Sequence, residues 1–257
     1  MQPGAITNYI DVAQLVLYAF WIFFAGLIYY LHREGKREGY PLLTERKGVT
    51  LQGFPFVPAP KTFLLANGHV VHAPRPEAPE VLNAVPSARF PGAPYQPIGN
   101  PMLSGMGPGA WARRADHPDL AFDDQMPKIV PLRSATAFFL DHDDPSLMGY
   151  EVFGLDGVHA GKIVDVWVDR SEYMVRYLEI ALAHPADATH VLMPIHYTEI
   201  DRKRQTIGTN FITGAQFATV PATRSPDTVT LLEEDKIMAY YAGGKMYAVP
   251  GRGDPLI

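Results

Sequence analysis

The amino-acid sequence predicts a single transmembrane α-helix followed by a mainly β domain that ends in a short C-terminal helix. An uninterrupted apolar run near the N-terminus predicts the transmembrane helix. Short stretches of alternating apolar and polar residues, which begin at residue 128, predict the β domain. A capped helical pattern between residues 230 and 244 predicts the final helix.

The predicted transmembrane helix covers residues 12–31, with the sequence VAQLVLYAFWIFFAGLIYYL. At about 1.5 Å of rise per residue, this run is long enough to cross a hydrocarbon core of about 30 Å. Gln14 is its only strongly polar residue. A buried core helix would show one polar face, and a cleaved signal peptide would carry Lys or Arg before a shorter apolar core. The run has neither feature, so we expect it to span the membrane.

The flanks of the run predict its orientation. Residues 1–11 carry one charged side chain, Asp11, whereas Lys and Arg are frequent directly after the run. Because basic residues accumulate on the cytoplasmic side of a membrane, we expect residues 1–11 in the periplasm and the main domain in the cytoplasm. Tyr29, Tyr30 and Arg33 have the amphipathic and cationic character of side chains at the lipid headgroups, and we predict that they contact lipid.

The composition excludes several classes of function. The formal net charge of -5 and the pI of about 6.0 indicate no general basic surface, so nucleic acid is not an expected partner. The chain has no cysteine, which excludes disulfides, thiolate catalysis and cysteine-ligated zinc or iron–sulfur clusters. It also has no phosphate loop, dinucleotide-binding glycine pattern or nucleophile elbow. We therefore predict no catalytic residues and no enzyme.

Residues 32–127 form the next predicted segment, which is rich in proline. Thirteen of the chain's 24 prolines lie between Pro41 and Pro108, a density that disfavours long helices and central strands. A disordered linker would have few aromatic residues, but this segment contains several. We therefore favour an irregular, ordered segment that packs on another surface. Asn67-Gly68 lies between two short apolar runs and predicts one hairpin.

Residues 128–250 form the predicted β domain with its helix. Five or six short alternating stretches, separated by turn residues such as Asp156-Gly157, are typical of a small antiparallel barrel or sandwich. The phrase GAQFATVP predicts a short helical turn. Thr230 is the predicted N-cap of the last helix and Glu233 completes a capping box, whereas Gly243-Gly244 should end the helix. Residues 251–257 remain as a tail.

Eight phrases match those of a known family in the expected order. They are REGYPL, PKTFLL, the PxGxP pattern that begins at Pro97, GPGAWARR, KIVPL, GKIVDVWVDRSEYMVRYLE, FATVP and TLLEEDKIMAYYAGGKMYA. The chain thereby resembles the family of H subunits of the photosynthetic reaction centre of purple bacteria. The resemblance covers most of residues 9–250.

This resemblance implies a chain anchored in the intracytoplasmic membrane, with a cytoplasmic barrel of the PRC type. It also implies that the proline-rich segment packs on partner subunits. It implies that the chain caps the L and M subunits, stabilises their quinone sites and conducts protons to the secondary quinone. Bacteriochlorophyll, bacteriopheophytin, quinones and non-haem iron would then belong to the partners, and this chain would bind none of them. A light-harvesting ring and a cytochrome subunit stay open as further partners.

The resemblance also assigns roles to two carboxylates. Glu172 occupies the family's WVDxxE position, which resembles a member of the proton path to the secondary quinone, and Asp169 precedes it in the same phrase. Carboxylates conduct protons when burial or neighbouring charge brings their pKa near the operating pH. The alternative is that Asp169 and Glu172 are ordinary solvated residues of a strand end and turn.

Three further residues are candidates for electrostatic or interface roles. Arg176 lies near this turn on a strand and pairs with Glu172, Glu233 or a partner's carboxylate, unless it is an ordinary surface residue. Glu233 and Glu234 begin the last helix, where interaction with the helix dipole already explains them. Docking of these two glutamates onto a partner subunit is the second interpretation.

Asp123 and Asp124 replace histidines that, in the resembled family, precede the KI-P phrase and resemble a proton-uptake point that also takes transition metals. The two aspartates retain the ability to collect protons, whereas sensitivity to metals is in doubt. The run DHDD around His142 is another group of oxygen ligands, but we expect a solvated loop there and predict no metal site.

Two other classes of protein fit parts of the sequence. A membrane-tethered adaptor with a PRC barrel would recruit a cytoplasmic partner through the same domains. A membrane-bound hydrolase using Asp169 and Glu172 would need a substrate pocket, which the sequence does not indicate.

Overall fold

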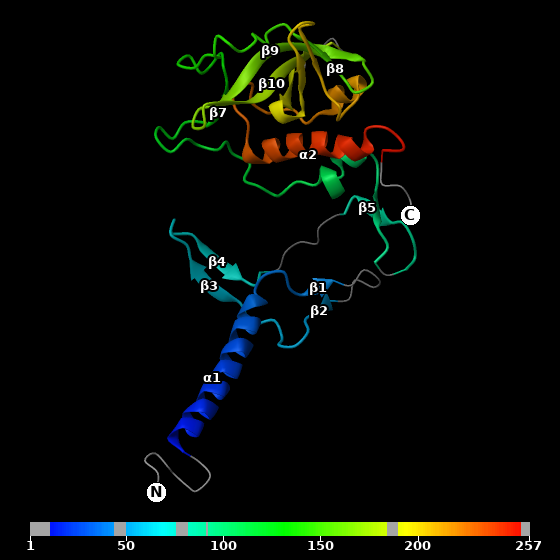
Figure 1. The fold of residues 1–257 in the computed structure, drawn as a ribbon. Helices are drawn as coiled ribbons and strands as arrows, with labels where there is room; N and C mark the ends of the chain where they lie inside the picture. The colour runs from blue at the N-terminus through cyan, green and yellow to red at the C-terminus, as the bar shows by residue number, and fades with distance from the viewer. Residues whose placement is uncertain (1–10, 44–49, 76–81, 91, 184–189, 253–257) are drawn as a thin grey trace. The chain divides into compact units, whose positions relative to one another are not determined.

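The computed structural model describes residues 11–43, 50–75, 82–90, 92–183 and 190–252 (Figure 1). The predicted N-terminal segment before Asp11 and most of the predicted tail lie outside these residues. The chain forms two compact units. The helix unit contains residues 1–81 and 89–93, and the barrel unit contains residues 82–88 and 94–257. Residues 94–127, part of the proline-rich segment, therefore belong to the same unit as the predicted β domain.

The helix unit begins with α1 (Val12–Gly35), a helix long and apolar enough to cross a membrane. Asp11 is its N-cap and accepts a hydrogen bond of 2.7 Å from the backbone N–H of Gln14, whose side chain completes a capping box. Capping thus explains the one strongly polar residue of the run. The helix continues for one turn beyond the predicted end at residue 31, through His32 and Arg33, before Lys36 caps it.

Two antiparallel pairs of short strands follow in the helix unit (Figure 1). Strand β1 (Leu42–Leu43) pairs with β2 (Thr50–Leu51), and β3 (Lys61–Leu64) pairs with β4 (Val70–Ala73). The second pair is the hairpin that Asn67-Gly68 predicts, and Gly68 has the positive φ of 81° that such a turn requires.

The first elements of the barrel unit are also short. Strands β5 (Ala84–Pro86) and β6 (Tyr95–Pro97) form a pair, and two 3-10 turns follow, η1 (Pro101–Leu103) and η2 (Gly107–Gly109). Proline lies within or at the end of most of these elements, which limits the number of ladder hydrogen bonds. Within the described part of this segment, the elements after α1 are therefore short, in agreement with the expected lack of long helices and central strands.

The core of the barrel unit is a seven-stranded sheet with the order β11-β10-β9-β8-β13-β12, to which β7 adds by pairing with β9. Its strands are β7 (Ile129–Pro131), β8 (Glu151–Phe153), β9 (His159–Asp169), β10 (Met174–Leu182), β11 (His190–Pro194), β12 (Glu199–Asp201) and β13 (Thr206–Gly208). The sequence predicted five or six strands. All pairs are antiparallel except β8 with β13. A mainly β domain is thus confirmed.

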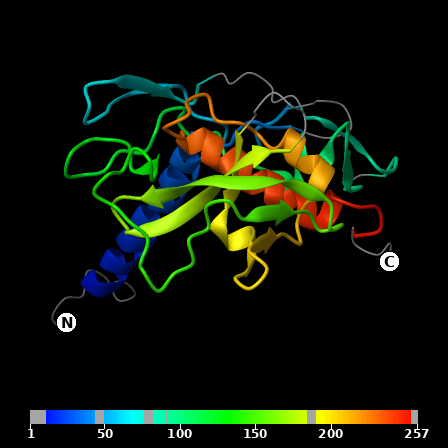
Figure 2. The same cartoon turned by 90° about the horizontal axis from the view of Figure 1, so that it is seen from above.

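Helix α2 (Leu231–Tyr247) lies across one face of the long strands β9 and β10 (Figures 1 and 2). The turn η3 (Ile195–Tyr197) and the turn η4 (Gly214–Thr219), predicted from GAQFATVP, complete the unit. Trp167 and Leu178 from the strands join Ile237 and Tyr241 from α2 in one buried apolar cluster. Burial of this cluster between sheet and helix is the main source of stability for the fold.

The predicted end of the last helix at Gly243-Gly244 is wrong, because α2 continues to Tyr247. Both glycines are buried against other backbone segments. A Cβ on Gly243 would lie 3.2 Å from the Cα of Gly109, and a Cβ on Gly244 would overlap the carbonyl oxygen of Phe211. These glycines therefore permit close packing within the helix and do not terminate it. The predicted start is confirmed, since Thr230 and Glu233 form the capping box.

Candidate functional site

The turn between β9 and β10 positions the two carboxylates that the WVDxxE phrase singles out. Asp169 is the last residue of β9 and is only 1% exposed. Its Oδ1 accepts hydrogen bonds from the backbone N–H groups of Ser171 at 2.9 Å and of Glu172 at 3.0 Å. Asp169 therefore fixes the backbone of the turn, and that turn presents Glu172 at the surface with 55% of its side chain exposed.

Lys128 connects these two carboxylates, although it was not among the residues predicted for this site. Its ammonium nitrogen lies 3.5 Å from Asp169 Oδ2 and 3.4 Å from Glu172 Oε1. Burial lowers the pKa of Lys128, but the charges and hydrogen bonds of the two carboxylates outweigh burial and raise the pKa above its ordinary value. The contact depends on the pairing of Ile129 in β7 with Asp169 in β9, which no local sequence pattern reveals.

The loop that contains Asp123 and Asp124 lies against the same turn. Asp124 forms an ion pair with Arg170, and Arg170 also donates a hydrogen bond of 3.2 Å to the carbonyl of Pro127. The bond from Arg170, together with one from the backbone N–H of Met126, holds the pKa of Asp124 below its ordinary value. Asp123 is exposed. The structure thus brings both predicted carboxylate pairs to one end of the sheet.

Arg176 lies at a bulge of β10, between the residues that pair with Val168 and Trp167 of β9. Within the described residues, it forms no ion pair with Glu172 or with Glu233, the two partners expected from the sequence. Its positive charge instead acts on buried Glu234 and lowers the pKa of that carboxyl, although burial raises it more. The bulge explains the difference, because an extra residue redirects the side chains of a strand.

The two glutamates of α2 have different surroundings. Glu233 accepts the backbone N–H of Thr230 at 2.9 Å and that of Arg224 at 3.0 Å, so capping accounts for its position. Glu234 is buried and accepts a hydrogen bond of 2.9 Å from the hydroxyl of Tyr177 in β10. Burial raises the pKa of Glu234 above its ordinary value despite this bond. Glu234 therefore joins the helix to the sheet.

A second ionic cluster, not recognised as a site from the sequence, lines an open pocket of about 670 Å³ on the barrel unit. Arg133 donates to Asp165 at 2.8 Å and to Glu179 at 2.6 Å. Glu179 also accepts the indole N–H of Trp167 at 2.8 Å, and His190 Nδ1 lies 2.6 Å from its other oxygen. Burial would raise the pKa of Glu179, but these hydrogen bonds outweigh burial and lower it. Alternate residues of a strand lie on the same face of a sheet, and this alternation along β9 and β10 was the sequence signal that could have indicated the cluster.

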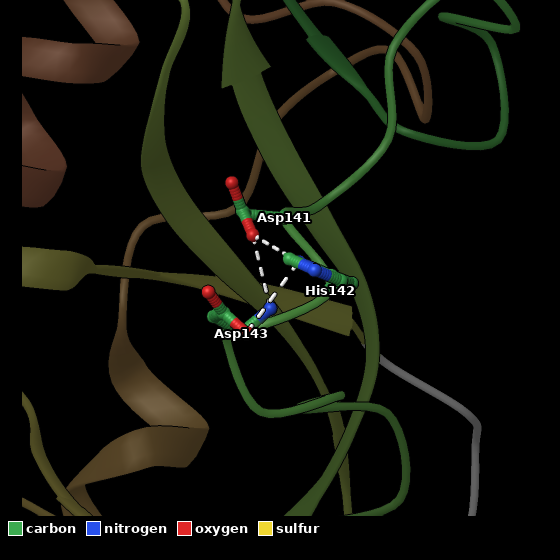
Figure 3. Close-up of side chains that lie close together, drawn as sticks. All are labelled: Asp141, His142 and Asp143. Carbon is green, nitrogen blue, oxygen red and sulfur yellow. Dashed lines mark hydrogen bonds and ion pairs between the residues drawn. The ribbon is translucent and has the colours of Figure 1, made fainter.

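The DHDD run forms a small group of possible metal ligands (Figure 3). One donor atom from each of Asp141, His142 and Asp143 lies within 4.8 Å of the others, and all three residues are exposed. Asp141 Oδ1 already accepts the backbone N–H of Asp143 at 2.9 Å and lies 2.8 Å from His142 Nδ1. The first of these bonds contributes most to lowering the pKa of Asp141. These contacts are internal to an exposed loop, and the expectation that it holds no metal stays a prediction.

The predicted lipid-interface residues lie in the last turns of α1 and are exposed. The ring of Tyr29 lies 6.1 Å from the ring of Phe54, and the ammonium of Lys61 lies 5.9 Å from the ring centre of Tyr30. Arg33 accepts a hydrogen bond of 3.2 Å through its carbonyl from the N–H of Lys36. This end of the helix therefore carries aromatic and cationic side chains together.

These features define a class of protein, a membrane-anchored chain whose main domain is mainly β and is covered by one helix. In agreement, the family model of the PRC-barrel domain matches residues 141–216. The family model described as the N-terminal region of the photosynthetic reaction centre H-chain matches residues 4–134, about half of the 257 residues. The chain belongs to the photosynthetic reaction centre H-chain family. It is therefore a single-pass reaction-centre subunit that associates with other subunits of that complex.

Proposed function

We propose that this chain caps the L and M subunits of the reaction centre on the cytoplasmic side of the intracytoplasmic membrane. In this orientation α1 (Val12–Gly35) begins at the periplasm, and the barrel unit lies in the cytoplasm. The proline-rich segment would pack on the partner subunits. The pigments, quinones and iron would belong to the partners, and this chain would contribute no redox group and no catalytic residue.

We further propose that the barrel conducts protons to the secondary quinone through Glu172. The arrangement of Glu172, Lys128 and Asp169 is the observation that supports this role most directly. Two carboxylates share one ammonium there, and Glu172 is held by a fixed turn while its side chain stays accessible. A partner surface that covers Glu172 would exclude bulk water from this site, so that protons would have to pass along side chains such as this carboxylate.

Asp123 and Asp124 are the proposed collectors of protons for this route. They differ in one respect, because the hydrogen bond from Arg170 favours the ionised form of Asp124. We therefore expect exposed Asp123 to contribute more to proton collection than Asp124 does.

The decisive experiment is Glu172→Gln in the assembled complex, with flash-induced electron transfer as the measurement. The first electron transfer to the secondary quinone should be unchanged, and the second, proton-coupled transfer should slow. Glu151→Gln is the matched control, since Glu151 is an exposed glutamate in the same sheet that pairs with His159. Equal rates in the wild type and in Glu172→Gln would remove Glu172 from the path.

An adaptor that recruits some other cytoplasmic protein is the remaining alternative for the barrel unit. Purification of the full chain in mild detergent separates the two functions. A reaction-centre subunit should carry along pigmented partners that absorb in the near infrared, whereas an adaptor should carry along colourless ones.

A further inference from the structure

The loop between β2 and β3 in the helix unit is tied to the end of α1 through one buried lysine. Lys36 follows the last residue of α1 and is 4% exposed. Its ammonium group donates hydrogen bonds of 2.8 Å to the carbonyl of Gln52 and of 2.7 Å to the carbonyl of Pro55. These carbonyls lie on either side of Phe54, so the loop is held on the helix end at two points.

The same loop, which follows β2, runs beside the C-terminal part of α1 (Figure 1). Tyr29 precedes Lys36 by seven residues, which is about 10 Å along the axis of a helix. The rings of Tyr29 and Phe54 are nevertheless only 6.1 Å apart. Phe54 therefore lies at the level of Tyr29, farther toward the middle of the apolar run than the lysine that holds its loop.

The side chains that this loop presents are aromatic and uncharged. Phe54 is 77% exposed and Phe56 is 70% exposed, and residues 52–56 have the sequence QGFPF. A second cation joins the next part of the chain to the helix end. Arg37 donates to the carbonyls of Ala59 at 2.8 Å and of Ala73 at 2.9 Å, at the ends of the neighbouring hairpin. Polar contacts thus hold the loop to the helix end, and its exposed aromatic ring Phe54 lies beside Tyr29.

We infer that residues 52–56, unlike the rest of the proline-rich segment, insert into the lipid headgroup region beside α1, with Phe54 and Phe56 in contact with acyl chains. The inference rests on the proposed role of α1 as the membrane anchor, because the membrane then fixes the depth of the loop. Exposed aromatic side chains are costly in water and favourable at this boundary. A lipid surface fits better than a protein groove because Phe54 lies beside Tyr29, on the helix that is long and apolar enough to span the membrane.

Site-directed spin labelling tests this inference well, since the chain has no cysteine and each introduced one is unique. Phe54→Cys is labelled with a nitroxide in the full chain, in vesicles of phosphatidylcholine and phosphatidylglycerol. The measurement is the ratio of collision with oxygen, which partitions into lipid, to collision with a water-soluble nickel chelate. We expect a ratio several-fold higher than at Phe139→Cys, a control at an exposed phenylalanine of the barrel unit.

Two further variants distinguish failure of the loop inference from failure of membrane anchoring by α1. Leu17→Cys in α1 should show the highest ratio, and a water-like value there would contradict membrane anchoring itself. If the collision ratio is lipid-like at Leu17→Cys but water-like at both Phe54→Cys and Phe56→Cys, the inference about the loop is overturned and membrane anchoring by α1 is not. In the assembled complex, a label at residue 54 that is shielded from both reagents would mean that a partner protein covers the loop, which also overturns the inference.

Discussion

The ammonium of Lys128 lies 3.4 Å from the carboxylate of Glu172, across 44 residues of sequence. The same ammonium lies 3.5 Å from buried Asp169, so one cation serves a structural carboxylate and an accessible one. This arrangement couples the fold of the turn to the charge of its exposed residue. Any change in the charge of Glu172 therefore alters the electrostatic interaction of Lys128 with Asp169, the residue that fixes the turn.

Replacement of Lys128 by Gln should destabilise the barrel unit. Without the ammonium, the buried charge of Asp169 loses its cation, and we expect a loss of roughly 1–3 kcal/mol of unfolding free energy. The measurement is thermal unfolding of the full chain in detergent, followed by tryptophan fluorescence. Lys162→Gln on the same sheet is the control and should have little effect, because Lys162 is exposed. Equal losses in the two variants would contradict the proposed role of Lys128.

Replacement of Arg133 by Met should have a larger and pH-dependent effect. Arg133 is the cation of both Asp165 and Glu179, and we expect a loss of roughly 2–4 kcal/mol after allowance for its partial exposure. The pKa of Glu179 is lowered in the folded state, so its contribution is present above about pH 4.5 and is lost as the pH falls through the folded-state pKa. The variant should therefore lose less stability than the wild type on acidification, measured by unfolding in urea.

Replacement of Glu234 by Gln tests a pH dependence of opposite sign. Because burial raises the pKa of Glu234, the folded state binds the proton more tightly than the unfolded state. Its contribution is fully present below the ordinary pKa and is lost as the pH rises through the folded-state pKa, at about 1.4 kcal/mol per pKa unit. Glutamine keeps an acceptor for the hydroxyl of Tyr177. We expect a variant whose stability changes less than that of the wild type as the pH rises above about 4.5.

Replacement of Gly244 by Ala should destabilise α2 although alanine favours helices. The new methyl group would overlap the backbone of Phe211, and the resulting overpacking should cost about 1–3 kcal/mol. Gly35→Ala is the matched control at the end of α1, where an added Cβ meets nothing within 4 Å. It should be neutral or slightly stabilising. A stable Gly244→Ala variant would indicate that α2 and Phe211 are packed less closely.

Two adjacent tyrosines of α2 should respond differently to loss of the hydroxyl. Among the described residues the hydroxyl of Tyr241 is buried without a hydrogen-bond partner, so Tyr241→Phe should leave stability unchanged or raise it by about 1 kcal/mol. The hydroxyl of Tyr240 lies 2.6 Å from that of Thr219 and donates to the carbonyl of Gln216 at 2.8 Å. Tyr240→Phe should therefore lose about 1 kcal/mol. Thermal unfolding of both variants under the same conditions gives the comparison.

Several parts of the fold followed from short-range patterns. The apolar run predicted α1, Asn67-Gly68 predicted the β3–β4 hairpin, and Thr230 with Glu233 predicted the start of α2. Each of these features depends on residues within a few positions of one another, or on the length of one continuous run. The sequence alone was therefore sufficient for them, as it was for the family.

The ionic contacts and the end of α2 were decided by tertiary structure. Lys128 reaches Glu172 only because β7 pairs with the end of β9. Arg133, which follows β7, reaches Glu179 only because β7 pairs with β9 and β9 pairs with β10. Gly243 and Gly244 lie within a helix and do not end it. They are glycines because other backbone segments pack where a Cβ would lie. Strand register and packing distance arise from many residues far apart in the chain, and local residue patterns carry no information about which of them will meet.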